Sequence, residues 1–150
     1  MESAATITAL LTAVLNTCAG GLGAWRWWTV EPSPAFWVLA RAAQAASALL
    51  AVVAGVLYLA GARPDDSLFW LYAVLPVAVS FFAEQFRILS AQTVLDARGL
   101  EDAQAVGRRS EAEQRSIVLQ IVRREIGVMT LGTLVAAFLA LRAITEVPGL

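Results

Sequence analysis

Four long apolar stretches constrain the fold of this chain more than any other feature. They cover residues 4–24, 35–61, 68–89 and 126–144. Each has the ~20 residues that a helix needs to cross a hydrocarbon core of ~30 Å. Membrane-spanning strands instead show alternating segments of ~10 residues, which this sequence lacks. The pattern therefore predicts four transmembrane helices.

Composition favours the same interpretation. The chain has 150 residues, enough for one domain, which we place at 1–150. Its hydrophobic fraction is 59% and its mean hydropathy is +0.68. Soluble domains are roughly 45–50% apolar, so a soluble bundle of this size would have to hide more apolar surface than it can bury. The excess is expected to face the lipid bilayer.

The connections between the first three stretches are short. Residues 26–34 and 62–67 contain Pro32, Pro34 and Pro64, which mark turns without interrupting a span. Helices joined by short turns pack antiparallel to one another. The predicted fold is all-α: a polytopic membrane protein with an up-and-down bundle of four transmembrane helices.

The third connection, residues 90–125, is the only long one and reads as a helical loop. Residues 90–97 can extend the third helix, and Gly99 is a natural stop for it. A short helix is expected at 100–106. Ser110 and Glu113 have the spacing of a capping box, which predicts that the last helix begins at Glu111.

The distribution of positive charge predicts the orientation. All eleven basic residues are arginine, which together with the many alanines is typical of a GC-rich bacterial genome. Seven of them flank the first and third connections, and two flank the other side: Arg26, Arg98, Arg108, Arg109, Arg115, Arg123 and Arg124, against Arg63 and Arg142. Because cytoplasmic loops carry the excess of basic residues, these two connections are predicted to be cytoplasmic, in the cell membrane, with both termini outside.

Missing residue types exclude several functions. The chain has no histidine, which rules out His-ligated haem, His-based metal sites and Ser-His or Cys-His catalysis. Cys18 is the single cysteine, so no internal disulfide or CxxC pair can form. A net charge of −1 gives no field that would attract nucleic acid. We therefore predict no enzyme activity, catalytic residues, cofactor or metal.

Polar side chains inside the predicted spans are the candidate functional residues. They are Asn16, Arg41, Gln44, Glu84, Gln85 and Arg87. Arg41 lies roughly 9 Å from the cytoplasmic end of its helix, and Glu84 lies roughly 24 Å from the outer end of the next one. Both therefore belong to the cytoplasmic third of the membrane, where antiparallel neighbours bring them together. The sequence predicts an intramembrane polar cluster there.

Two interpretations of this cluster stay open. Charged groups within a membrane often mark a site for an ion, a proton or a small anion, which indicates a small transporter or channel. Alternatively, the cluster is a structural ion-pair network that holds the helices together. Arginines near an interface can extend toward water, which favours the structural interpretation. It predicts an accessory subunit of a larger membrane complex, or a protein that associates with itself.

Small residues predict where helices approach most closely. Gly20, Gly21 and Gly23 fall within one turn of the first span. Helices in membranes pack through small residues because these let the backbones come together. We expect this segment to lie against another helix.

Overall fold

The computed structural model describes residues 2–62 and 68–146, and within these ranges it is helical and contains no strand. Its five helices are α1 (Glu2–Thr29), α2 (Pro34–Leu59), α3 (Leu68–Ala97), α4 (Ala103–Gly107) and α5 (Glu111–Thr145). Four of them, α1, α2, α3 and α5, are long and apolar enough to cross a membrane. The prediction of an all-helical chain with four such helices is confirmed.

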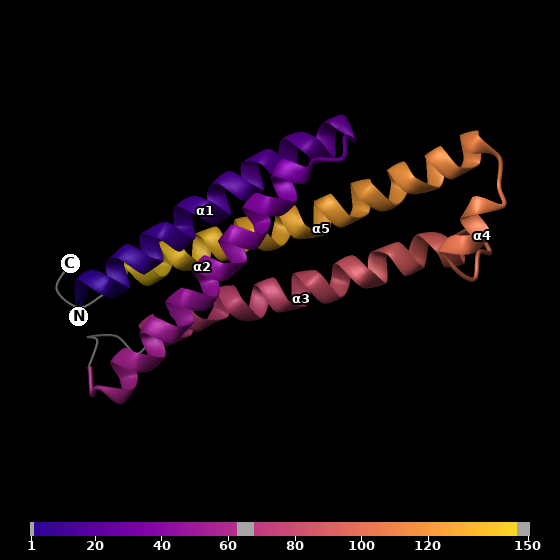
Figure 1. The fold of residues 1–150 in the computed structure, drawn as a ribbon. Coiled ribbons are helices and arrows are strands. Elements are labelled where there is room, and N and C mark those ends of the chain that lie inside the picture. The colour runs from indigo at the N-terminus through magenta and orange to yellow at the C-terminus, as the bar shows by residue number, and fades with distance from the viewer. Residues whose placement is uncertain (1, 63–67, 147–150) are drawn as a thin grey trace.

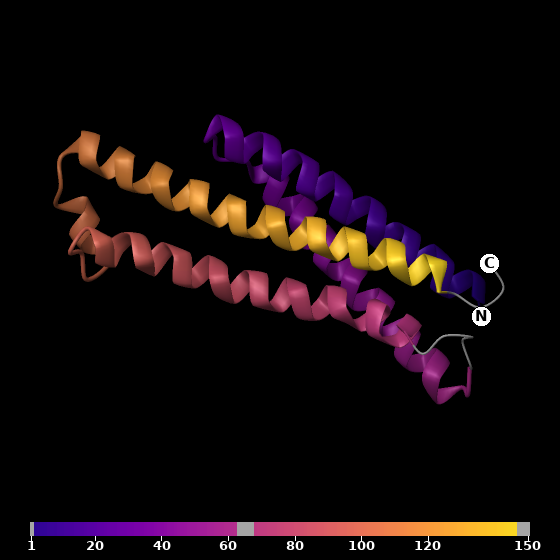
Figure 2. The same ribbon diagram turned by 180° about the vertical axis from the view of Figure 1, so that it is seen from behind.

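The long helices pack as neighbours in a closed order. α1 lies against α2 and α5, and α3 also lies against α2 and α5. Successive long helices run in opposite directions (Figure 1). Seen from behind, α5 lies between α1 and α3 (Figure 2). α5 therefore packs extensively on two helices, α1 from the start of the chain and α3 from its middle.

The first connection is shorter than predicted. α1 continues to Thr29, and the next helix starts at Pro34, which leaves residues 30–33 to reverse the chain. Nothing in the Trp-rich segment before Thr29 breaks a helix, and the first proline comes only at position 32. Ser33 caps α2, its Oγ accepting a hydrogen bond from the Phe36 N–H at 3.2 Å. Most of the second predicted turn, residues 63–67, lies outside the described residues.

Predicted helix ends in the third connection are found close to where the sequence placed them. α3 extends to Ala97, and Gly99 follows it with a φ of +64°, a conformation in which glycine avoids a steric penalty. α4 starts three residues later than expected because Asp102 caps it, its Oδ1 accepting from the Ala105 N–H at 2.8 Å. Ser110 and Glu113 form the predicted capping box, and α5 begins at Glu111.

α3 and α5 extend beyond the other two long helices as a hairpin that α4 closes (Figure 1). At ~1.5 Å per residue, the 35 residues of α5 span about 52 Å, well beyond a ~30 Å hydrocarbon core. The hairpin has its own small core of Val94, Leu100 and Ile117. Arg98 strengthens it by donating hydrogen bonds to Ser116 and Gln120.

Small residues fill the contact between α1 and α5. A Cβ added to Gly23 would collide with Thr130 and Phe36, and one added to Gly20 would collide with Leu134. Both positions are buried, so α1 and α5 approach closely because these side chains are absent. Gly21 faces open space instead. The small-residue contact that the sequence predicts is therefore present, through two of the three glycines.

Candidate functional site

A hydrogen-bonded ion pair joins α2 to α3. The Arg41 guanidinium donates from one nitrogen to Glu84 Oε1 at 2.6 Å and to Gln44 Oε1 at 2.7 Å. Gln44 in turn donates from Nε2 to the same Glu84 oxygen at 2.9 Å. Arg41 and Gln44 are three residues apart, which puts them on one face of α2, where both can reach α3.

Arg87 continues this network from α3 to α5. Its Nε donates to the second Glu84 oxygen at 3.0 Å, one turn along the same helix. Its terminal nitrogen lies 3.6 Å from Glu125 Oε1 on α5. The guanidinium also stacks over the Trp37 ring, 5.2 Å from its centre. Arg87 thus contacts an acidic group on each side and an aromatic face on α2.

Glu125 also belongs to this group, although the sequence did not predict it there. It is the last residue of the predicted cytoplasmic connection, one residue before the last apolar stretch. The structure puts it at the same level as Arg87, because α5 runs antiparallel to α3. Its position as the last acidic residue before the span was the available signal. We call Arg41, Gln44, Glu84, Arg87 and Glu125 the inter-helix charge network.

The charge network is internally balanced. It contains two arginines and two glutamates, so its formal charge is zero. The side chains of Glu84, Glu125 and Arg87 are 19%, 21% and 26% exposed, whereas that of Arg41 is 56% exposed. Buried charges are tolerated when they are paired and hydrogen-bonded. Glu84 and Arg87 are partly buried and meet this condition, Glu125 is partly buried and is paired with Arg87 at 3.6 Å, and Arg41 extends outward from the group.

Asn16 lies apart from the charge network. Its Nδ2 donates to the Thr12 carbonyl at 2.9 Å, to Ser47 Oγ at 3.3 Å and to the Ala43 carbonyl at 3.4 Å. The bonds to Ser47 and Ala43 connect α1 to α2. Ser47 is six residues beyond Arg41, about 9 Å further along α2. Asn16 is therefore a separate polar contact, nearer the middle of the helices.

Gln85 also lies outside the charge network. It is exposed on α3, although Glu84 before it is mostly buried. Each helical step turns the side chain by about 100°, so consecutive residues cannot share one face. The structure thus brings together four of the six candidates, Arg41, Gln44, Glu84 and Arg87, and leaves Asn16 and Gln85 elsewhere.

The arrangement can hold helices together, since its ion pairs and hydrogen bonds join α2, α3 and α5. In residues 2–62 and 68–146, no group of three or more Cys, Asp or Glu side chains comes together to hold a metal ion. Each glutamate of the charge network faces an arginine. The groups of this site can pair charges and exchange hydrogen-bond partners.

Fold and site together define a class of protein: a helical chain with four potential membrane spans and a paired cluster of charges between three of them. Comparison with protein-family models, with curated proteins and with solved structures gave no match to this chain.

Proposed function

We propose that the chain is a multi-pass protein of a bacterial cell membrane, with α1, α2, α3 and α5 as an up-and-down bundle. Large apolar side chains on the outer faces of all four helices support this. Ile7, Val52, Val74 and Phe138 are 50% to 64% exposed, one on each helix. Large apolar side chains exposed on every long helix are covered best by lipid or by a partner protein.

The orientation proposed from the sequence has both termini outside and the first and third connections in the cytoplasm. The long α3–α5 hairpin would then project into the cytoplasm. Trp25 and Trp28 lie at the same end of the bundle and are 63% and 77% exposed. Indole rings favour the membrane interface, so this level fits the cytoplasmic interface.

Within the membrane, we propose a structural role: an accessory subunit of a larger membrane complex, or a subunit of a homo-oligomer. The observation that carries this proposal is the pairing of the intramembrane charges with one another. A network that joins α2, α3 and α5 and sums to zero charge strengthens helix contacts. It leaves the outer apolar faces as the surfaces on which a partner would bind.

Purification from native membranes in a mild detergent tests this role. Mass spectrometry and size measurement would identify what remains bound to the full chain. A stoichiometric larger partner, or a symmetric oligomer of this chain, is the expected result. Recovery of the protein as a monomer, both before and after cross-linking in intact membranes, would contradict it.

A small transporter or channel is the second candidate, and the position of Arg41 favours it. Its side chain is the exposed member of an otherwise mostly buried charge network. A guanidinium that reaches from a paired cluster toward the surface can exchange Glu84 for an incoming anion. Flux through liposomes that contain the purified protein tests this candidate. Flux that disappears in Glu84→Gln, while the protein remains folded, would establish it over the structural role.

A further inference from the structure

Two pockets lie next to each other along α5. One, of about 400 Å³, is lined by Val79, Phe82, Ala83 and Phe86 of α3 and by Val128, Leu131, Gly132 and Val135 of α5. The other, of about 450 Å³, is lined by Ala24, Trp27, Ser90, Arg124, Gly127, Val128, Thr130, Leu131 and Leu134. Val128 and Leu131 line both, so the two pockets adjoin, and we call them together the α3–α5 groove. Its volumes fall within the range of ligand pockets.

The groove is as long as one leaflet of a membrane is deep. Its α3 wall runs from Val79 to Ser90 and its α5 wall from Arg124 to Val135. Each wall covers eleven residue steps, or about 16 Å. Half of a ~30 Å hydrocarbon core is about 15 Å. Because the helices are antiparallel, Ser90 and Arg124 stand at one end of the groove, and Val79 and Val135 at the other.

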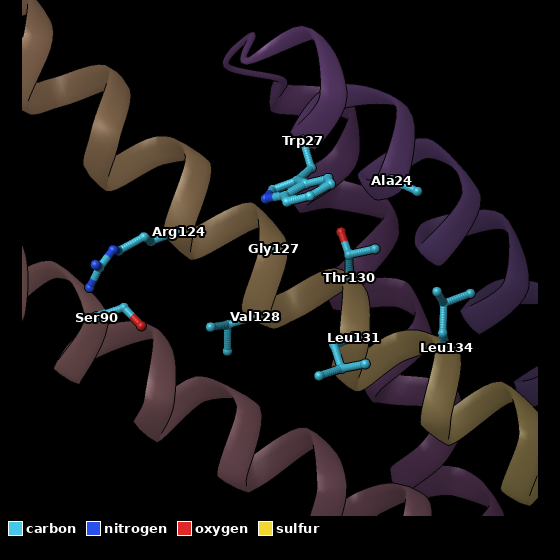
Figure 3. A pocket seen from close by; sticks show the side chains of 9 residues that line it. All are labelled: Ala24, Trp27, Ser90, Arg124, Gly127, Val128, Thr130, Leu131 and Leu134. Carbon is cyan, nitrogen blue, oxygen red and sulfur yellow. The ribbon is translucent and has the colours of Figure 1, made fainter.

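The two ends differ in chemistry. Figure 3 shows Arg124 extending from α5 across the groove toward Ser90 of α3. Trp27 lines the same end from α1, and its indole lies over Gly127, where an added Cβ would be only 2.9 Å from the indole nitrogen. The opposite end is lined by aliphatic and phenylalanine side chains. The groove is therefore amphipathic along its length.

Arg124 is an available cation at this end. It is exposed and has no acidic partner among the described residues, unlike Arg41 and Arg87. It lies two residues before the apolar stretch of α5, which is the level of lipid headgroups if the bundle spans a membrane. Basic groups at such a level between helices attract anionic headgroups.

We propose that the α3–α5 groove binds an anionic phospholipid, with its phosphate at Arg124 and Ser90 and an acyl chain along Phe82, Phe86 and Val135. The inference rests on the proposed membrane insertion. The exposed phenylalanines, 57% and 56% for Phe82 and Phe86, supply the apolar contact for the chain. One cation, one hydroxyl and a leaflet-length apolar trough match this ligand in charge, polarity and length.

Native mass spectrometry of the full-length protein tests the proposal. The purified protein is offered phosphatidylglycerol and phosphatidylcholine with identical chains, and the retained lipid is measured. We expect the wild type to prefer phosphatidylglycerol. Arg124→Gln should weaken that binding roughly five-fold, the equivalent of about 1 kcal/mol for one basic residue. Arg115→Gln is the matched control, since Arg115 is exposed on α5 and lies outside the groove.

A second variant tests the apolar part. Val135→Phe should reduce retention of both lipids, because the larger ring fills the chain end of the groove. Soluble glycerophosphate, which has the headgroup charge without the chain, is expected to bind far more weakly than the lipid. Thermal unfolding of each variant in detergent checks that the protein is folded.

Several results would overturn the proposal. These are equal retention of the two lipids by the wild type, equal loss in the Arg124 and Arg115 variants, or binding of glycerophosphate as strong as that of the lipid. A protein segment cross-linked to the groove in native membranes would also overturn it. Resistance of the wild type to alkaline extraction from membranes is measured separately. Extraction of the wild type by alkali would contradict the proposed insertion itself. If the wild type resists extraction, a failure of the lipid experiments concerns the lipid site alone.

Discussion

Glu84 is the residue on which the charge network depends. Each of its two oxygens is bonded, one by Arg41 and Gln44 and the other by Arg87. Bonds to charged groups contribute more than neutral ones, about 1.5–3 kcal/mol each. If Glu84 loses its charge, Arg41 loses its carboxylate partner and Arg87 retains only Glu125, at the longer distance of 3.6 Å.

Glu84→Gln is therefore expected to lower the free energy of unfolding by about 1–3 kcal/mol, because one carboxylate currently neutralises two cations. Thermal unfolding of the purified protein in detergent, followed by tryptophan fluorescence, measures the change. Glu101→Gln is the control, since Glu101 is exposed and lies in the loop before α4. It should have almost no effect. Equal stability of the Glu84 variant and the wild type would show that the network contributes nothing to the fold.

Glu113 shows how a local motif changes a carboxyl group outside the four apolar stretches. Its side chain accepts hydrogen bonds from the Ser110 hydroxyl at 3.0 Å and the Ser110 N–H at 3.2 Å. These bonds favour the charged form and lower the pKa of Glu113 below its usual value. Because the pKa is lowered, the cap stabilises the helix fully at pH values above the usual pKa of a glutamate carboxyl group. This contribution is lost as the pH falls through the lowered value.

We expect Ser110→Ala to return the pKa of Glu113 toward its usual value, because the hydroxyl that favours the carboxylate is removed. Titration of the Glu113 carboxyl carbon by NMR measures the pKa in both proteins. Protection of the first α5 amides against hydrogen exchange should fall on acidification in the wild type. An unchanged Glu113 titration in the variant would show that the capping box does not set this pKa.

The packing of α1 against α2 and α5 depends on glycines of α1 that have no side chain. Gly23 faces Thr130 of α5 and Phe36 of α2, so the three helices meet at this point. Gly132 of α5 allows a similarly close approach to α3, since a Cβ added there would lie 2.7 Å from the Cβ of Ala83. α5 can lie close to both neighbours because small residues face it on each side.

Gly23→Ala and Gly21→Ala form a matched pair that tests this contact. Gly23→Ala should destabilise the fold by about 1–3 kcal/mol, because the methyl group forces α1 away from α5. Gly21→Ala meets nothing within 4 Å and should be neutral or slightly stabilising, since alanine favours the helix. Thermal unfolding in detergent measures both. A similar change in the two variants would contradict the close packing of α1 on α5.

Across the whole molecule, the α3–α5 hairpin makes the two ends unequal. One end has the hairpin, most of the arginines and three neighbouring tryptophans, and the other has the start of α1 and the end of α5 (Figure 1). If the chain spans a membrane, we expect this asymmetry to give it one orientation, and the excess of arginine predicts that the hairpin lies in the cytoplasm.

Cysteine labelling on intact cells tests this orientation. Cys18 is changed to serine, and a single cysteine is placed at Glu101 or at Thr145. A maleimide that cannot cross the membrane should label position 145 and not position 101, which should react only after the cells are opened. The reverse pattern would show that the chain inserts the other way. Labelling of both positions on intact cells would contradict a single orientation.

The sequence alone determined the number, type and approximate ends of the helices. The length of an apolar stretch, a helix cap and a turn residue each depend on a few neighbouring positions, so they can be recognised in the sequence. Gly99 follows the end of α3, and Ser110 and Glu113 form the capping box of α5, as the sequence predicts. The ion pair between Arg41 and Glu84 was also within reach, because depth in two antiparallel helices follows from residue counting.

Only the tertiary structure decided which candidates meet. Glu125 joins Arg87, Asn16 bonds to Ser47, and Gln85 remains outside. These outcomes depend on the rotation of each helix about its axis and on the choice of neighbours. Both are set by how α5 packs between α1 and α3, and α1 and α5 lie at opposite ends of the sequence. Hydropathy identifies a span but says little about its rotation in a helix that is apolar on every side, and the packing of neighbouring side chains supplies that information.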